Sequence, residues 1–263
     1  MPPVGAEAIP PHPLPPLAAA AVLPHPPLLV PELAGGAAAE LDPLRVACHR
    51  ALSAVRAAAD LIVVVGGGPA WAVPWPSAPG SFRPYGADVG VSLPVPVDFD
   101  LSGLPPPARL EELPLSLAVA AHLLAGVDPP PGRVFAATVP PSLGPDAAAA
   151  VGHALTGGDP AGGRVGLVAM GDLSACRTER APGAYRAEAA GFDASVAEAL
   201  RSGNPERLLD LDPTQAGELL VAGRVPLQVL AGACEGGPAM RGQVLYDDAP
   251  YGVGYLVALL TPP

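Results

Sequence analysis

Short, uniformly apolar stretches alternate along the chain with longer stretches in which apolar residues recur at helical spacing. The apolar stretches predict strands that are buried on both faces of a sheet, at residues 17–23, 61–65, 133–139 and 164–170. The helical spacing predicts helices at residues 37–60, 110–126, 144–155, 185–203 and 204–211, and a broken helix at 214–233. This alternation predicts a single α/β domain with a central, mostly parallel sheet and helices on both faces.

Three parts of the chain depart from the alternation. Residues 1–16 are rich in proline and predict a poorly ordered segment ahead of a domain at 17–263. Residues 67–108 are rich in glycine, proline and aromatic residues and predict a long irregular segment, in which 89–99 form an edge strand. Residues 243–260 predict a final pair of strands around a Pro-Tyr-Gly turn.

Composition and charge narrow the classes of partner. Half of the 263 residues are apolar and 15% are charged, which is enough apolar material for one large core. The formal net charge is −11, and all 14 Lys and Arg residues are arginine, as codon bias in a GC-rich genome would produce. The densest basic stretch, at 177–186, also contains Glu179, so no basic stripe exists and a nucleic-acid partner is not expected.

The cysteines and the apolar runs indicate a cytoplasmic protein. Cys48, Cys176 and Cys234 are an odd, sparse set without CxxC spacing, which argues against a disulfide framework and a zinc ribbon. No basic residues precede the first apolar stretch, and prolines interrupt it, so a signal peptide is not expected. No run of 18 apolar residues occurs, so no membrane partner is expected.

Candidate chemistry lies where the predicted strands end. Ligands of open α/β sheets bind at the carboxyl ends of strands, and three such ends carry Pro24-His25, Gly66-Gly67-Gly68 and Gly171-Asp172-Leu173-Ser174. His25 is either a loop residue packed against prolines or a metal ligand or acid/base group. The three glycines favour a tight turn over a dinucleotide fingerprint, because Trp71 stands where small residues are needed.

Other polar residues allow weaker interpretations. Ser174 lacks the Gly-x-Ser-x-Gly frame of a hydrolase nucleophile, so it caps a turn or faces a pocket. Cys176 beside Arg177 is an alternative reactive thiol. His49, His122 and His153 lie within predicted helices, where packed or surface positions are the commoner outcome.

Five segments together resemble a known family. They are "PHPPLL" (24–29), "ADLIVVVGGG" (59–68), "LPLSLAV" (113–119), "MGDLSACRT" (170–178) and "APYGVGYLVALL" (249–260). In this order they resemble the subunit-B superfamily of class III extradiol ring-cleavage dioxygenases, including its Memo-like relatives. The resemblance spans about residues 17 to 260 and is strongest to divergent, alanine-rich members of high-GC bacteria.

The resemblance implies a single α/β domain that holds Fe(II) with two histidines and a glutamate, and a further histidine as acid/base. His25 matches the first ligand, and Glu218 is the carboxylate in the window for the glutamate, so both are predicted metal residues. The second ligand histidine is replaced by the glycine turn at 66–68, and Ala175 stands where the acid/base histidine is expected. No catalytic residue is therefore assigned, and binding of Fe(II) and absence of a cofactor are both open.

Two main hypotheses for function follow. The first is a non-catalytic or repurposed member of this superfamily that binds a small aromatic molecule or a protein. The second is an active non-haem metal-dependent oxidoreductase whose site is rebuilt around His25 with His49, Asp172 or Cys176. An NAD(P)-linked oxidoreductase is a third, resting only on the glycine turn. Family analogy also suggests a homodimer.

Overall fold

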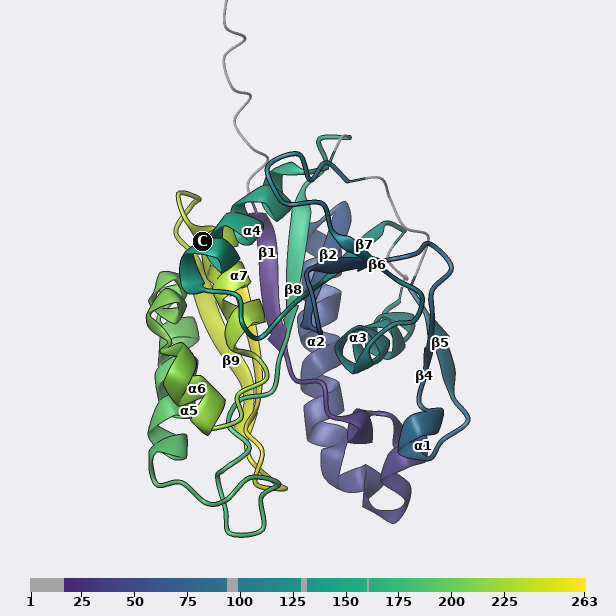
Figure 1. Ribbon diagram of the computed structural model, residues 1–263, viewed down its shortest axis with the longest axis vertical. Helices are drawn as coiled ribbons and strands as arrows, with labels where there is room; N and C mark the ends of the chain where they lie inside the picture. Colours follow the sequence, from purple (N-terminus) through teal and green to yellow (C-terminus); the bar gives the residue numbers. More distant parts are fainter. Residues whose placement is uncertain (1–16, 94–98, 129–131, 160) are drawn as a thin grey trace, which may run out of the picture.

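An eight-stranded sheet runs through the middle of the computed structural model, which describes residues 17–93, 99–128, 132–159 and 161–263 (Figure 1). The order across the sheet is β6-β3-β7-β2-β8-β1-β10-β9. The strands are β1 (Leu17–Leu23), β2 (Leu61–Gly67), β3 (Ala72–Pro74), β6 (Ala108–Leu110), β7 (Val134–Val139), β8 (Val165–Met170), β9 (Arg241–Asp248) and β10 (Tyr255–Thr261). A separate two-stranded sheet pairs β4 (Pro79–Ser81) with β5 (Gly90–Ser92).

The centre of the sheet is parallel. Strands β7, β2, β8 and β1 lie side by side and run in one direction. Strands β10 and β9 add to β1 in antiparallel order, while β3 pairs antiparallel with β7 and parallel with β6. The central strands are apolar throughout because both faces of the sheet are covered, and the predicted mostly parallel α/β sheet is confirmed.

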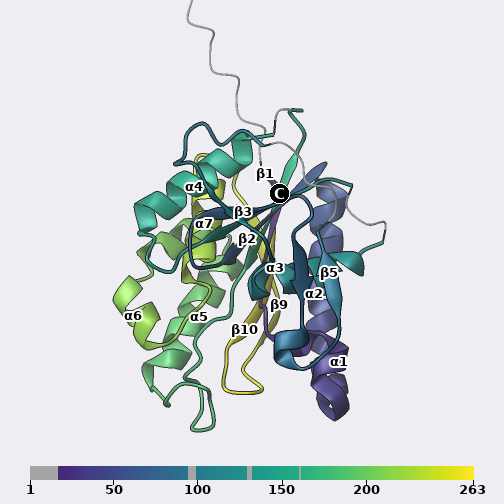
Figure 2. The same ribbon diagram turned by 45° about the vertical axis from the view of Figure 1, so that its right-hand side comes forward.

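Helices cover both faces of the sheet, as predicted (Figures 1 and 2). Helices α1 (Pro31–Ala34), α2 (Asp42–Ala58) and α3 (Leu115–Ala125) pack on one face, where Ile62 and Val64 of β2 point. Helices α4 (Pro145–Gly157), α5 (Glu188–Arg201), α6 (Pro213–Glu218) and α7 (Arg224–Cys234) pack on the other, against Val63 and Val65. Successive residues of a strand point to opposite faces, so one strand supplies both cores.

The predicted helix at 110–126 was wrong at its start. Residues 108–110 form strand β6, and α3 begins only at Leu115. Pro114 precedes the helix in an extended conformation, with φ −65° and ψ 165°. Proline also restricts the residue before it to extended backbone, so the apolar run could not continue as a helix through Leu113 and Pro114.

The ends of several other helices and strands also differ from the prediction. Residues Gly35–Leu41 form a 3-10 helix, and α2 starts at Asp42, with Pro43 in its first turn. The segment predicted at 204–211 is a 3-10 helix over Pro205–Asp210. The described part of the long irregular segment contains the short strands β3, β4 and β5 and the start of β6. Within the edge strand predicted at 89–99, the described residues form a strand at Gly90–Ser92, outside the main sheet. Residues 1–16 and 94–98 lie outside the described residues.

Among the described residues, no helix is both long enough and apolar enough to cross a membrane.

Candidate ligand site at the carboxyl end of the sheet

His25 lies just beyond the carboxyl end of β1, and Asp172 lies just beyond the end of β8. Because β1 and β8 are parallel neighbours, the sheet brings these two residues together across 147 positions of sequence. The His25 backbone N–H donates a hydrogen bond of 2.7 Å to Asp172 Oδ1. The His25 side chain is 12% exposed, so the imidazole is held at the rim of the core.

The imidazole of His25 lies near the same carboxylate. Its Nδ1 lies 3.9 Å from Asp172 Oδ1, and this nitrogen is buried without a hydrogen-bond partner among the described residues. A carboxylate at this distance favours the tautomer with the proton on Nδ1, which leaves Nε2 as an acceptor. A buried nitrogen without a partner is costly, so a bound molecule or water that reaches this ring would stabilise it.

A cavity of about 280 Å³ opens beside His25. Its walls come from the end of β2, the end of β7 and the segment that enters α7. The lining residues are His25, Gly67, Gly68, Val139, Pro141, Val221, Ala222, Arg224, Val225 and Pro226. This is the crevice at the carboxyl ends of strands where open α/β sheets bind ligands.

The wall formed by α7 is electropositive. Arg224 is 4% exposed, and its guanidinium donates to the carbonyls of Pro141 and Leu143 and to Gln228 Oε1. No carboxylate among the described residues forms an ion pair with it, and burial lowers the pKa of Arg224. The N-terminus of α7 adds a positive partial charge and has no side-chain cap at Gly223. The cavity therefore favours a ligand with an electronegative group.

The tight turn predicted at Gly66-Gly67-Gly68 was wrong for the first two glycines, which continue β2 and pair with Thr138 and Val139 of β7. A Cβ on Gly66 would lie 2.3 Å from Ser116 Oγ, and one on Gly68 would lie 2.6 Å from Thr138 Cβ. Ser116 donates to the Gly67 carbonyl at 2.8 Å, and Thr138 donates to the Ala70 carbonyl at 2.9 Å. No larger residue fits at 66 or 68 unless Ser116 or Thr138 moves, so this segment presents only backbone to the cavity.

The other residues that match the family pattern lie outside the cavity lining. Glu218 is the last residue of α6, is exposed and does not line the His25 cavity. Ser174 is buried and donates its backbone N–H and its hydroxyl to Asp193, which also pairs with Arg177 at 2.9 Å. Ser174 therefore anchors a loop to α5 and has no accessible hydroxyl.

Of the residues considered for a rebuilt metal site, Asp172 alone forms a contact with His25. Cys176 is 2% exposed and its Sγ lies 4.0 Å from the Glu218 carbonyl. His49 lies on α2 against Gly126, where burial lowers its pKa. His153 pairs with Glu235 at 3.4 Å on an exposed surface.

The described residues do not fit a three-ligand iron site. Within residues 17–93, 99–128, 132–159 and 161–263, no group of three or more His, Cys, Asp or Glu side chains could hold a metal ion. His25 has Asp172 beside it, and the turn that would supply the second histidine is closed by Ser116 and Thr138. The pairing of His25 with Glu218 stays a prediction, and no reaction step is derived through iron.

Sequence reasoning missed the residues that shape this cavity. Arg224 stands directly after a glycine and two residues before Pro226, a composition typical of a helix start, which could have placed it at the sheet edge. Ser116 and Thr138 could not be recognised from the sequence, because their role depends on hydrogen bonds to the segment 67–70, which is far away along the chain.

Comparisons with known proteins bear on the fold. No protein-family model matches the chain, and no curated protein matches it. The structure is similar to that of the uncharacterized protein JW3007 from Escherichia coli K12, with a TM-score of 0.58 and 13% sequence identity. The match covers 92% of this chain and 99% of the other, so almost the whole chain shares that fold.

Proposed function

We propose that this protein is a repurposed relative of the class III extradiol dioxygenases that binds a small molecule in the His25 cavity. One observation carries the proposal: His25, held by Asp172, borders a cavity of about 280 Å³ at the carboxyl end of the sheet. In this crevice the glycines at 66–68 stand in the place where the family resemblance expects the second ligand histidine.

The walls of the cavity define the class of ligand. Val139, Val221, Val225 and Pro226 supply apolar surface, while His25 Nε2 and the electropositive start of α7 supply polar contacts. A small, partly apolar molecule with an acidic hydroxyl or carboxylate satisfies both, because its electronegative oxygen gains from the helix N-terminus. A phenol or catechol belongs to this class, in keeping with the small aromatic ligand expected from the resemblance.

Ring cleavage is not part of the proposed function. The residue after Gly171-Asp172-Leu173-Ser174 is Ala175, which cannot transfer a proton, and loss of a general base typically costs about 10²–10⁴ in rate. The described residues also lack a group of three metal-ligating side chains. These two observations favour binding over turnover.

Metal content tests the proposal against the alternative of a rebuilt metalloenzyme. The protein is purified anaerobically after iron supplementation, beside a His25→Ala variant, and metal is measured by plasma mass spectrometry. We expect far less than one iron per chain in both. Stoichiometric iron that is lost in the variant, together with oxygen consumption on addition of catechol, would establish the metalloenzyme.

Ligand binding is tested separately by thermal unfolding with catechol as the probe. Catechol is expected to raise the Tm of the wild type and to leave the Tm of His25→Ala unchanged. His153→Ala is the matched control, because His153 is an exposed histidine outside the cavity. An equal shift in all three proteins would contradict the assignment of the site.

We further propose a cytoplasmic location and a homodimer. The three cysteines support the first, because all are free thiols, as expected in a reducing compartment. The homodimer rests on family analogy, and sedimentation velocity of the purified protein tests it directly.

A further inference from the structure

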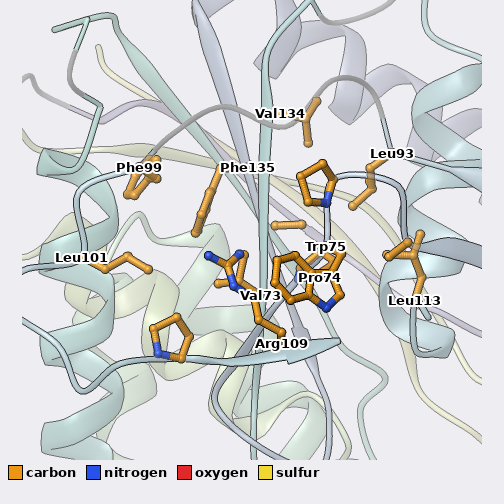
Figure 3. A pocket seen from close by; sticks show the side chains of 14 residues that line it. Val73, Pro74, Trp75, Leu93, Phe99, Leu101, Arg109, Leu113, Val134 and Phe135 are labelled. Carbon is orange, nitrogen blue, oxygen red and sulfur yellow. The ribbon is translucent and has the colours of Figure 1, made fainter. Parts of the chain in front are cut away.

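A second cavity, also of about 280 Å³, lies toward the other end of β7 (Figure 3). Val134, Phe135 and Ala136 from the first half of β7 line it, whereas Val139 at the end of that strand lines the His25 cavity. At about 3.3 Å per residue, the two cavities meet β7 at points about 10 Å apart. The second cavity is therefore separate from the proposed His25 site.

The cavity occupies a gap in the sheet. Strand β3 pairs with β7 only at Ala72 and Thr138, so no described strand runs beside Val134–Ala136 on that side. Side chains from the β3–β4 connection, from β6 and from Phe99 and Leu101 surround the gap instead. All the described lining residues except Arg109 are apolar, which suits an apolar or aromatic molecule.

Three aromatic side chains, Trp75, Phe99 and Phe135, line the cavity. Phe99 stacks on Phe135 with ring centroids 4.2 Å apart and an interplanar angle of 22°. Trp75 lies on the opposite side of the cavity and is 49% exposed, an unusual position for so large an apolar side chain. Figure 3 shows these rings around one space, with Leu93 and Leu113 beyond Trp75. Offset stacking on such rings favours an aromatic ligand.

Arg109 is the only charged residue that lines the cavity among the described residues. Its guanidinium carbon lies 5.0 Å from the centre of the Trp75 ring, and Figure 3 shows it directed from β6 into the cavity. No described residue accepts a hydrogen bond from this guanidinium or forms an ion pair with it. An arginine that stacks on an indole and makes no hydrogen bond or ion pair with a described residue is suited to bind a carboxylate in a bidentate manner.

We propose that this cavity binds an aromatic carboxylate. The ring of the ligand lies between Trp75 and the Phe99–Phe135 stack, and its carboxylate accepts hydrogen bonds from Arg109. Local charge complementarity supports an anion, because Arg109 is the one charged residue among the described residues that line this cavity. The proposal does not depend on the function proposed for the His25 cavity.

Isothermal titration calorimetry with 1-naphthoate tests the proposal. Its neutral analogue 1-naphthalenemethanol serves as the second probe. The wild type is expected to bind 1-naphthoate at least tenfold more tightly than the alcohol. Arg109→Gln is expected to weaken naphthoate binding about tenfold and to remove the preference for the anion, since one charge-assisted contact is worth about that factor. Arg109 is exposed, so the variant is expected to fold.

Two matched controls locate the binding. Arg83→Gln removes an exposed arginine that pairs with Asp88 outside the cavity, and it is expected to bind 1-naphthoate as the wild type does. His25→Ala is also expected to leave this binding unchanged. The proposal is overturned if the wild type does not bind 1-naphthoate, if Arg109→Gln binds it unchanged, or if either control loses binding as Arg109→Gln does.

Discussion

His25 depends on Asp172 for its position. The carboxylate accepts the His25 backbone N–H at 2.7 Å and lies 3.9 Å from the ring nitrogen Nδ1. The backbone around Asp172 is held by its own hydrogen bonds: the Gly171 N–H donates to the Leu23 carbonyl at 2.8 Å, and the Gly223 N–H donates to the Asp172 carbonyl at 2.8 Å. Asp172 therefore binds the His25 N–H from a fixed position and places a carboxylate 3.9 Å from the ring nitrogen Nδ1.

Replacing Asp172 separates these two effects. Asp172→Ala leaves the His25 N–H without its acceptor and is expected to lower the free energy of unfolding by about 1–2 kcal/mol. Asp172→Asn keeps an acceptor oxygen but removes the charge, so the stability stays closer to the wild type while the imidazole tautomer shifts toward Nε2–H. Urea unfolding measures the free energy of unfolding, and ¹⁵N NMR of the imidazole ring measures the tautomer. An unchanged midpoint for Asp172→Ala would contradict this role.

Leu220 is the second residue that shapes the site. It has a φ of 55°, the left-handed region that a leucine rarely adopts, and its side chain is 54% exposed. The Val221 N–H donates to the Ala216 carbonyl at 2.8 Å, which closes α6 and turns the chain toward the cavity wall at 221–222. The backbone at this corner is strained so that the wall can form.

Leu220→Gly is expected to raise the free energy of unfolding by about 1 kcal/mol, because glycine adopts this conformation without the steric cost. Leu220→Ala is the control: it loses the same exposed side chain but keeps a Cβ, so no gain is expected. Thermal unfolding of the wild type, Leu220→Gly and Leu220→Ala measures the change in stability. A gain in the alanine variant equal to that of glycine would place the effect in the side chain.

At the scale of elements, α4 and α7 touch along their backbones. A Cβ on Gly152 of α4 would lie 2.1 Å from the Val229 carbonyl oxygen, and one on Gly232 of α7 would lie 2.4 Å from Ala149 Cα. Glycine normally weakens a helix, but here it lets two helices approach more closely than any other residue would allow. This contact holds α7, and with it Arg224, against the sheet.

Glycine-to-alanine substitutions should therefore have opposite signs in different helices. Gly152→Ala is expected to destabilise the protein by about 1–3 kcal/mol, since the methyl group meets backbone atoms that cannot move aside independently. Gly191→Ala in α5 is the matched control, because a Cβ there meets open space, and it is expected to stabilise by about 0.5–1 kcal/mol. Chemical unfolding measures the change in the free energy of unfolding for each variant. Changes of the same sign would contradict the packing described for α4 and α7.

At the scale of the whole molecule, a buried ion pair ties the starts of β7 and β8 together. Arg133 donates to both carboxylate oxygens of Asp159, at 2.9 and 2.6 Å, and the Asp159 side chain is fully buried. The N–H groups of Ala161 and Gly163 also donate to this carboxylate. The hydrogen bonds from Arg133 hold the pKa of Asp159 below its ordinary value, against the burial that raises it.

The stability of the fold should depend on pH through this pair. Because the folded-state pKa of Asp159 is lower than its unfolded-state pKa, the pair contributes stability that is fully present above about pH 4 and is lost as pH falls through the folded-state pKa. Asp159→Asn is expected to cost about 2 kcal/mol at pH 7 and progressively less below pH 4. Urea unfolding from pH 7 to pH 3 measures the difference. A difference that stays constant with pH would refute this linkage.

The sequence by itself determined the class of fold and the edge at which to look for a site. The strands predicted at 17–23, 61–65, 133–139 and 164–170 form, the last two starting one residue later at Val134 and Val165, because a strand buried on both faces is almost entirely apolar. Of the short strands, β5 overlaps the edge strand predicted at 89–99, whereas β3, β4 and β6 were not predicted, since three residues are too few to show an alternation of apolar and polar positions. His25 was found because parallel strands end at one edge.

Only the tertiary structure decided what surrounds that histidine. Asp172 contacts His25 because β1 and β8 are neighbours, and Arg224 lines the His25 cavity because α7 packs on the sheet. The sequence placed Asp172 at a strand end, but it did not show that Asp172 contacts His25 or that Arg224 lies beside them. The cavity at Arg109 likewise exists because β3 pairs with β7 at a single position and leaves a gap. Local pattern fixes which residues are buried, but cavities and charge contacts arise between elements that are distant along the chain, so they follow from packing alone.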